Sequence, residues 1–413
     1  MSAAFAAAGW HINPSVTHRP DRSHIFEADV VASKWSPSGN ERILVEAKSG
    51  KKSGMGDVFK LLGQQHFLDL GSSVLVRASD SAENIDSAIG RLTELGVSVL
   101  NACKTESDLS QALEPAGFGK AKVEDIQCWH FALTIRRKLL EGLGGEYEDP
   151  GIQGFVAKMK EQEWVANDAL FEDLDPLIRL SRLCELYKTH GKLAKSCEKV
   201  LSASGEPGGQ IKDANAVEAH PLMYTAMFLD LRARMATATA VVEYLSSTDF
   251  EFDELAHVNE LLKLPSSMAG ALEQLRSSPE LGVFPLIWQC YIYRFGGFLV
   301  LGRIDVELKS LADQCGVSSD VVKSALGLWD LLFPGFEWYS EIYGVRLLKF
   351  VPAPLQGLGS FHRASIAGLE RQQDGTMNFE NVFGEYVDSF LRPRFGVCWH
   401  RYYGQDWRDE NLS

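Results

Sequence analysis

Two apolar segments joined by a short turn constrain the fold of this chain most strongly. Residues 26–32 and 42–48 are rich in β-branched and other apolar side chains. Residues 36–41, which lie between them, contain a proline, a glycine and an asparagine, which is typical of a hairpin turn. An antiparallel hairpin is therefore expected in the first fifty residues.

Alternating helix and strand patterns surround this hairpin. The expected elements are helices over residues 2–8, 57–70 and 82–95, and strands over residues 10–16, 72–77 and 97–102. The proline within residues 10–16 disfavours a central position for that strand. This order predicts a small α/β domain, in which a mixed sheet is flanked by helices.

Charged residues stand at corresponding places in the two hairpin strands. Asp29 lies in the first strand, and Glu46 and Lys48 end the second. Because side chains two apart in a strand share a face, Glu46 and Lys48 are expected side by side. Carboxylates on adjacent strands can converge on Mg²⁺ or Mn²⁺, which prefer hard oxygen ligands. A neighbouring lysine can stabilise negative charge that develops beside such an ion.

This arrangement resembles the PD-(D/E)xK restriction-endonuclease-like nuclease superfamily, nearest to its type IV restriction and Holliday-junction-resolvase-like groups. The residues that carry the resemblance are Asp29, the Glu46-Ala47-Lys48 triplet and the helix containing Gln64, and they cover about residues 1–104. The resemblance implies a Mg²⁺- or Mn²⁺-dependent endonuclease acting on DNA, with RNA not excluded, in antiviral defence or DNA processing. It also implies a metal held by Asp29, Glu46 and the Ala47 carbonyl, with Lys48 and Gln64 as further catalytic residues.

Two of these assignments have rivals nearby in the sequence. Gln65 competes with Gln64 for the helical position. Asp21 belongs to a literal Pro-Asp pair but lies in a polar loop, so Asp29 is preferred.

Several residues around the site are expected to support it. Lys51, Lys52 and Lys60 are candidate nucleic-acid contacts, although Lys51 and Lys52 fit a solubilising pair equally well. Glu27, two residues before Asp29, is either a further carboxylate or a rim residue. His24 either acts in the site or is an ordinary loop residue.

The first helix departs from the family pattern because residues 2–8 contain no acid. Many family members carry a glutamate there that completes the metal site. The site then works with fewer carboxylates, or Glu27 substitutes, or the domain is impaired. The alternative function is accordingly a catalytically inactive nuclease-fold scaffold that binds nucleic acid or a protein.

The formal net charge of −14 belongs to the later part of the chain, because basic and acidic side chains balance over residues 1–104. Proteins that coat nucleic acid usually carry the opposite sign. The balance argues against a coating role and separates the first domain from an acidic remainder. That remainder is either solvated surface or a platform for a protein partner or second copy.

Cysteine usage and hydropathy predict a cytoplasmic protein without membrane contact. The seven cysteines form no Cys-x-x-Cys pair, which is typical of reduced thiols. The N-terminal residues lack the features of a signal peptide. Residues 282–301 are apolar but interrupted by Gln289, Arg294 and two glycines, so we expect a buried helix followed by a short element.

The predicted fold class is a multidomain α/β plus α protein. The expected regions are a nuclease-like domain over residues 1–105, a helical domain over 106–300, a winged-helix-like module over 301–352 and an aromatic-rich segment over 353–413. The expected amphipathic helices of the helical domain cover residues 123–143, 173–188 and 221–245.

The winged-helix-like module is expected from two helices joined by a turn and followed by a hairpin around Gly344. Its second helix, residues 319–332, carries one lysine and two aspartates. Helices that read a DNA groove usually carry Arg, Lys, Asn or Gln, so a protein-binding or structural role is favoured.

Overall fold

The computed structural model of the 413-residue chain describes its first third and several later segments. The described residues are 1–18, 26–36, 39–49, 54–79, 83–146, most of 150–160, of 229–245 and of 276–295, then 299–300, 304–332 and 347–348. The chain divides into two compact units, of which the first includes Met1–His130 and the second begins at Phe131.

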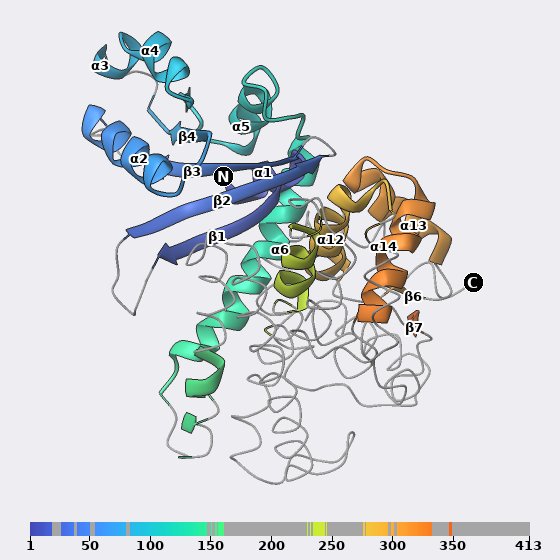
Figure 1. Cartoon of the computed structure of the whole chain (residues 1–413). Helices are drawn as coiled ribbons and strands as arrows, with labels where there is room; N and C mark the ends of the chain where they lie inside the picture. The colour runs from blue at the N-terminus through green and yellow to red at the C-terminus, as the bar shows by residue number, and fades with distance from the viewer. Residues whose placement is uncertain are drawn as a thin grey trace. The chain divides into compact units, whose positions relative to one another are not determined.

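A five-stranded mixed sheet forms the centre of the first unit, with the strand order β1-β2-β3-β4-β5 (Figure 1). The strands are β1 (His11–His18), β2 (Phe26–Ser36), β3 (Gly39–Lys48), β4 (Ser72–Arg77) and β5 (Val97–Leu100). The first three pair antiparallel, and β4 and β5 continue the sheet parallel to β3. The predicted mixed sheet is confirmed, and Pro14 lies in the edge strand β1, where a missing N–H donor is tolerated.

The β2–β3 hairpin is tighter than the sequence predicts. Pairing continues to Ser36 and Gly39, so only residues 37–38 separate the strands. The turn expected over residues 36–41 was therefore too long, because backbone pairing extends into positions with turn-forming side chains.

Five helices of the first unit accompany this sheet: α1 (Ser2–Ala7), α2 (Met55–Phe67), α3 (Glu83–Asp86), α4 (Ile89–Glu94) and α5 (Glu106–Leu113). α2 contacts β3 and β4. Its side chains Val58 and Leu61 share a buried core with Leu44 of β3. The helix predicted over residues 82–95 is instead two short helices, since the chain turns at Ser87 and Ala88 after residues that favour turns.

An aromatic cluster ties the start of the first unit to residues beyond its predicted boundary at 105. Trp10 Nε1 donates a hydrogen bond to the Phe118 carbonyl oxygen at 2.7 Å. The rings of Phe5 and Phe118 lie 5.7 Å apart, edge to face. Because these side chains are buried together, the first unit continues past α5.

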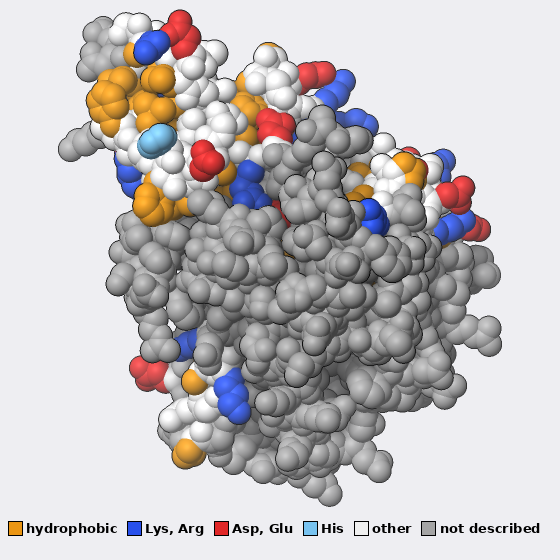
Figure 2. Space-filling view, in the orientation of Figure 1, with side chains coloured by type: hydrophobic (Ala, Val, Ile, Leu, Met, Phe, Trp, Pro, Cys, Tyr) orange, Lys and Arg blue, Asp and Glu red, His pale blue; other side chains and the backbone are white. Residues whose placement is uncertain are grey.

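Several large apolar side chains of the first unit remain exposed. They are Phe59 and Phe67 on α2, Ile89 on α4 and Leu95 just after it. Figure 2 shows hydrophobic side chains gathered on the surface of this part of the molecule. Isolated exposed apolar residues are ordinary, whereas a gathered group is typical of a contact surface.

Helix α6 (Val123–Glu141) begins in the first unit and enters the second. It confirms the helix predicted over residues 123–143 and is followed by a 3-10 turn, η2 (Gly142–Gly144). Residues 234–243 are helical, within the helix predicted over residues 221–245. The helix predicted over residues 173–188 lies outside the described residues.

Three helices of the second unit pack on one another: α12 (Phe284–Phe295), preceded by a 3-10 turn, η3 (Leu281–Val283), then α13 (Ile304–Cys315) and α14 (Ser319–Leu332). Trp288 of α12 is buried and donates Nε1–H to the Ala325 carbonyl oxygen of α14 at 2.8 Å. Its ring lies 5.7 Å from that of Trp329. These contacts fix α12 against α14.

A short two-stranded sheet accompanies these helices. β6 (Leu299–Val300) pairs antiparallel with β7 (Leu347–Leu348). The buried helix and short element predicted over residues 282–301 are confirmed, and none of the helices described is long and apolar enough to cross a membrane. Of the hairpin predicted around Gly344, residues 347–348 pair with residues 299–300, and residues 333–346 lie outside the described part, as does the segment 353–413.

Substituting Gly96 by alanine should destabilise the first unit. Gly96 has φ +76°, and an added Cβ would lie 2.4 Å from the Gly71 carbonyl oxygen, so the backbone must shift. We expect Gly96→Ala to lower the free energy of unfolding by about 1–3 kcal/mol. The matched control is Gly63→Ala in α2, where nothing lies within 4 Å and alanine should stabilise by up to about 1 kcal/mol. Urea denaturation measures both; equal midpoints would contradict the expectation.

Acid should weaken the first unit through His11 of β1. Burial, followed by the charge of Arg42, lowers the pKa of His11 from 6.5 to about 3. His11 takes up a proton near pH 6.5 in the unfolded chain but only near pH 3 in the folded chain. The free energy of unfolding therefore falls as the pH drops from 6.5 towards 3, by at most about 1.4 kcal/mol per pH unit. Denaturation between pH 7 and 5 should therefore be less pH-dependent in His11→Leu; equal dependence would count against this assignment.

Candidate functional site

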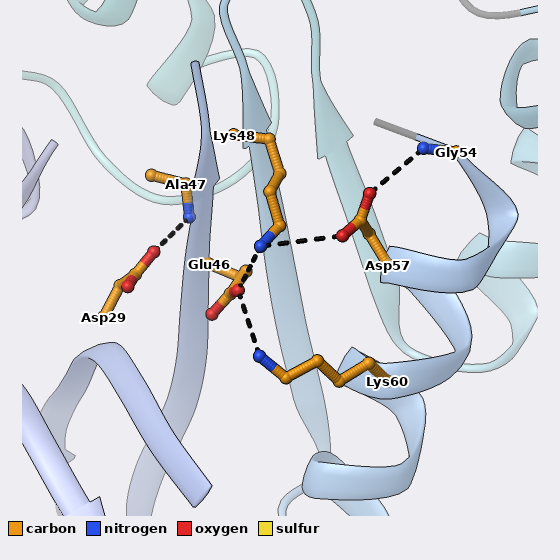
Figure 3. A network of polar contacts seen from close by, with 7 residues as sticks. All are labelled: Asp29, Glu46, Ala47, Lys48, Gly54, Asp57 and Lys60. Carbon is orange, nitrogen blue, oxygen red and sulfur yellow. Dashed lines mark hydrogen bonds and ion pairs between the residues drawn. The ribbon is translucent and has the colours of Figure 1, made fainter. Parts of the chain in front are cut away.

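Asp29 stands where β2 separates from β3. The backbone pairing of these strands ends at Val30 and Val45. Beyond that pair, Asp29 Oδ2 accepts the N–H of Ala47 at 2.7 Å, so a side chain takes a backbone donor (Figure 3). The half-buried carboxylate of Asp29 is thereby fixed near the end of strand β3.

The strand geometry around Asp29 is also irregular. Ala28 and Val31 belong to the same core cluster, although residues three apart in a regular strand point to opposite faces. In β1, Ser15 lies between the partners of Ala28 and Val30 and has φ +56°. A local break of this kind redirects side chains, and such breaks are common beside functional sites.

Glu46 and Lys48 lie on the face of β3 that is turned towards α2 (Figure 3). Lys48 Nζ donates to Glu46 Oε1 at 2.6 Å. The Glu46 side chain is only 5% exposed, whereas that of Lys48 is 27% exposed. Burying a carboxylate is costly unless a cation accompanies it, and Lys48 provides that cation from two residues away.

Helix α2 brings further charges to this pair. Lys60 Nζ lies 3.6 Å from Glu46 Oε1, so two ammonium groups approach one carboxylate oxygen. Asp57 Oδ1 lies 3.6 Å from Lys48 Nζ, and Asp57 Oδ2 accepts the Gly54 N–H at 3.1 Å. The result is a chain of alternating charges from Lys60 to Glu46, Lys48 and Asp57 (Figure 3).

Lys48 is a cation in this arrangement. Its hydrogen bond to Glu46 raises its pKa above the ordinary lysine value, and the negative charges of Glu46, Asp57 and Asp29 act in the same direction against its desolvation. A lysine held in its charged form stabilises negative charge and does not take a proton from water at neutral pH.

The two glutamines of α2 have different surroundings. Gln65 is buried, accepts the Ser73 hydroxyl at 2.6 Å and donates to the Leu95 carbonyl oxygen at 3.2 Å, so it joins α2 to the sheet. Gln64 is also buried, but neither atom of its amide has a hydrogen-bond partner among the described residues. The structure thus gives Gln65 a role in the fold, whereas the role predicted for Gln64 stays a prediction.

One oxygen of the site has the chemistry that a hard divalent cation prefers. Glu46 Oε2 is buried and accepts no hydrogen bond from the residues described, and carboxylate oxygens are the ligands that Mg²⁺ and Mn²⁺ prefer. Within the described part of the chain, no three His, Cys, Asp or Glu side chains gather closely enough to hold an ion. A cation bound here would therefore have to be held by the carboxylates of Asp29 and Glu46 together with backbone oxygen and solvent.

The remaining predicted residues are exposed or lie outside the described part. Glu27 is exposed. Lys51, Lys52, His24 and the rival Asp21 fall outside the described residues. α1 is almost wholly buried and carries no acid, as its sequence indicates.

Asp57 is the site residue that sequence reasoning missed. Its position was recognised only as the start of a helix. The signal was its spacing of three from Gly54, since an acid at the third helical position caps the preceding backbone N–H and so points back towards the strand that enters the helix.

Comparisons with protein-family models, with curated proteins and with solved structures found no match to this chain.

Removing Lys48 should destabilise the metal-free first unit. Lys48→Met leaves the buried Glu46 with Lys60 alone, so the free energy of unfolding should fall by about 1–3 kcal/mol. Adding Glu46→Gln to Lys48→Met removes the stranded charge and should recover part of the loss. Urea denaturation in EDTA measures both. Lys323→Met, which breaks an exposed pair with Asp320, is the control with an effect below about 1 kcal/mol.

Proposed function

We propose that the first unit is a metal-dependent endonuclease that hydrolyses phosphodiester bonds of DNA. The observation that carries the proposal is that Glu46 and Lys48 pair at the end of β3, where Asp29 accepts the N–H of the residue between them. Lys48 Nζ lies 2.6 Å from Glu46 Oε1, and Asp29 Oδ2 accepts the Ala47 N–H. The negative charge of Asp29 also contributes to raising the pKa of Lys48. Two carboxylates beside a charged lysine suit an anionic phosphoryl substrate once a cation offsets the carboxylates.

The proposed metal ligands are Asp29, Glu46 and the carbonyl oxygen of Ala47. When bound, Mg²⁺ or Mn²⁺ supplies charge neutralisation and lowers the pKa of a bound water. The Asp29 carboxylate is already held by the Ala47 N–H, and Glu46 Oε2 is already free of hydrogen bonds within the described residues. Little rearrangement of these two side chains is therefore needed.

The roles of the other side chains follow from their charge and position. Lys48 orients the attacking water and stabilises the additional negative charge on the phosphoryl oxygens. Lys60, whose side chain is 53% exposed, contacts a backbone phosphate of the substrate. The buried amide of Gln64 donates to the substrate or to a water beside it.

The second unit is proposed to act as a sensor or partner platform. The order α12, β6, α13, α14 and β7 is compatible with a winged-helix-like module. Lys323 of α14 is paired with Asp320 at 3.3 Å, which favours protein contact over groove reading. The exposed apolar side chains of α2 and its surroundings support a protein partner or second copy of the chain.

A non-catalytic scaffold is the second candidate function. The favouring observation is that Lys48 and Lys60 already neutralise Glu46 from within the protein. In this alternative the unit binds nucleic acid or a partner and cleaves neither DNA nor RNA.

Cleavage assays separate the two candidates. We expect the full chain with Mg²⁺ or Mn²⁺ to cleave plasmid, branched or single-stranded DNA, and EDTA to stop the reaction. Lys48→Ala should reduce the rate by about 10²-fold or more, because it removes a charge that acts in the transition state. Lys323→Ala in the second unit is the control and should cleave at the wild-type rate.

The opposite results are equally informative. Binding without cleavage of several DNA and RNA forms would establish the scaffold in place of the enzyme. Cleavage by Lys48→Ala at the wild-type rate would place the catalytic site elsewhere in the chain.

A further inference from the structure

Lys48 lies between two carboxylates at unequal distances. Its Nζ is 2.6 Å from Glu46 Oε1 and 3.6 Å from Asp57 Oδ1. A small rotation of a flexible lysine side chain exchanges the nearer partner for the farther one. The ammonium group therefore has two acceptors within reach of one backbone position.

Asp57 is held in place independently of Lys48. Its Oδ2 accepts the Gly54 N–H at 3.1 Å, and its own backbone N–H donates to the Gly54 carbonyl oxygen at 3.0 Å. An acid in the first turn of a helix is also favoured by the helix dipole. Oδ1 thus remains directed at Lys48 whichever carboxylate the lysine contacts.

Glu46 cannot serve a divalent cation and Lys48 equally well. The ammonium occupies Oε1 at hydrogen-bond distance, and two cations beside one carboxylate repel each other. Glu46 Oε2 is open to the cation, but the repulsion between the two cations favours movement of the ammonium away from Glu46 when the metal binds. Without a second acceptor, that movement would leave a partly buried ammonium without a partner.

We propose that Asp57 becomes the main ion-pair partner of the Lys48 ammonium when Glu46 binds a divalent cation. Asp57 is then a positioning residue: it stabilises the lysine in the metal-bound state and so favours metal binding at Glu46. This inference rests on the proposed metal-dependent function. Asp57 is not assigned as a third ligand, since one of its oxygens holds Gly54 and the described carboxylates do not form a cluster of three around an ion.

A double-mutant cycle on the full chain tests the inference through Mn²⁺ binding, measured by isothermal titration calorimetry. Asp57→Asn keeps an acceptor for Gly54 but removes the charge that receives Lys48. We expect it to weaken Mn²⁺ binding about tenfold in the wild-type background and less than about twofold in a Lys48→Met background, because no lysine then needs a second partner. Asp57→Glu should restore most of the affinity.

The matched control is Asp108→Asn. Asp108 occupies the same capping position in α5, where it accepts the N–H groups of Lys104 and Thr105. It should leave Mn²⁺ affinity unchanged. Circular dichroism and urea denaturation in EDTA show whether each variant is folded, and Lys48→Gln replaces Lys48→Met if the latter is not.

Each outcome has one meaning. Equal weakening by Asp57→Asn with and without Lys48 would show that Asp57 ligates or attracts the metal directly, and an unchanged affinity would show that it has no part in binding; either result overturns the inference alone. If the wild type binds no Mn²⁺, both the inference and the proposed metal-dependent function are overturned.

Discussion

The buried carboxylate of Glu46 is the constraint on which the end of the sheet depends. Its side chain is 5% exposed, next to the core formed by Leu44 and Leu75 on the same sheet. A carboxylate in such surroundings requires a cation at short range. Lys48 meets this need from the same strand and Lys60 meets it from α2, so the first turns of α2 are held at the end of β3.

Asp29 depends on a different property of the same region. Because β2 pairs with β3 only from Val30 onwards, the Ala47 N–H has no backbone acceptor on β2. The Asp29 side chain provides the acceptor instead. The irregular backbone at Ser15 in β1 accompanies this change of direction. A fully regular sheet would satisfy Ala47 by a backbone carbonyl and would leave no reason for an acid at residue 29.

The sequence predicted those parts of the site that depend on local periodicity. Glu46 and Lys48 share a face because the strand repeat is two, and the order of helices and strands predicted a mixed sheet, of which β4 and β5 are the strands parallel to β3. The spacing of Asp57 from Gly54 indicates a capping role, whereas its approach to Lys48 depends on how the first turn of α2 packs against the sheet, which no local pattern contains. Likewise, Gln64 and Gln65 are equivalent as a sequence pair and differ because Ser73 on β4 donates a hydrogen bond to Gln65, which in turn donates to the Leu95 carbonyl oxygen.

Under the proposed function, the contacts that stabilise the metal-free site also oppose the binding of an ion. The two lysines that offset the burial of Glu46 would compete with a metal ion for that carboxylate and so would weaken metal binding. A second acceptor would reduce this competition without exposing the carboxylate to solvent. Asp57 supplies that acceptor from a helix-capping position, where its geometry is maintained by the backbone and not by the lysine. A capping residue can thus link the first turn of a helix to the ion pairs of a neighbouring strand.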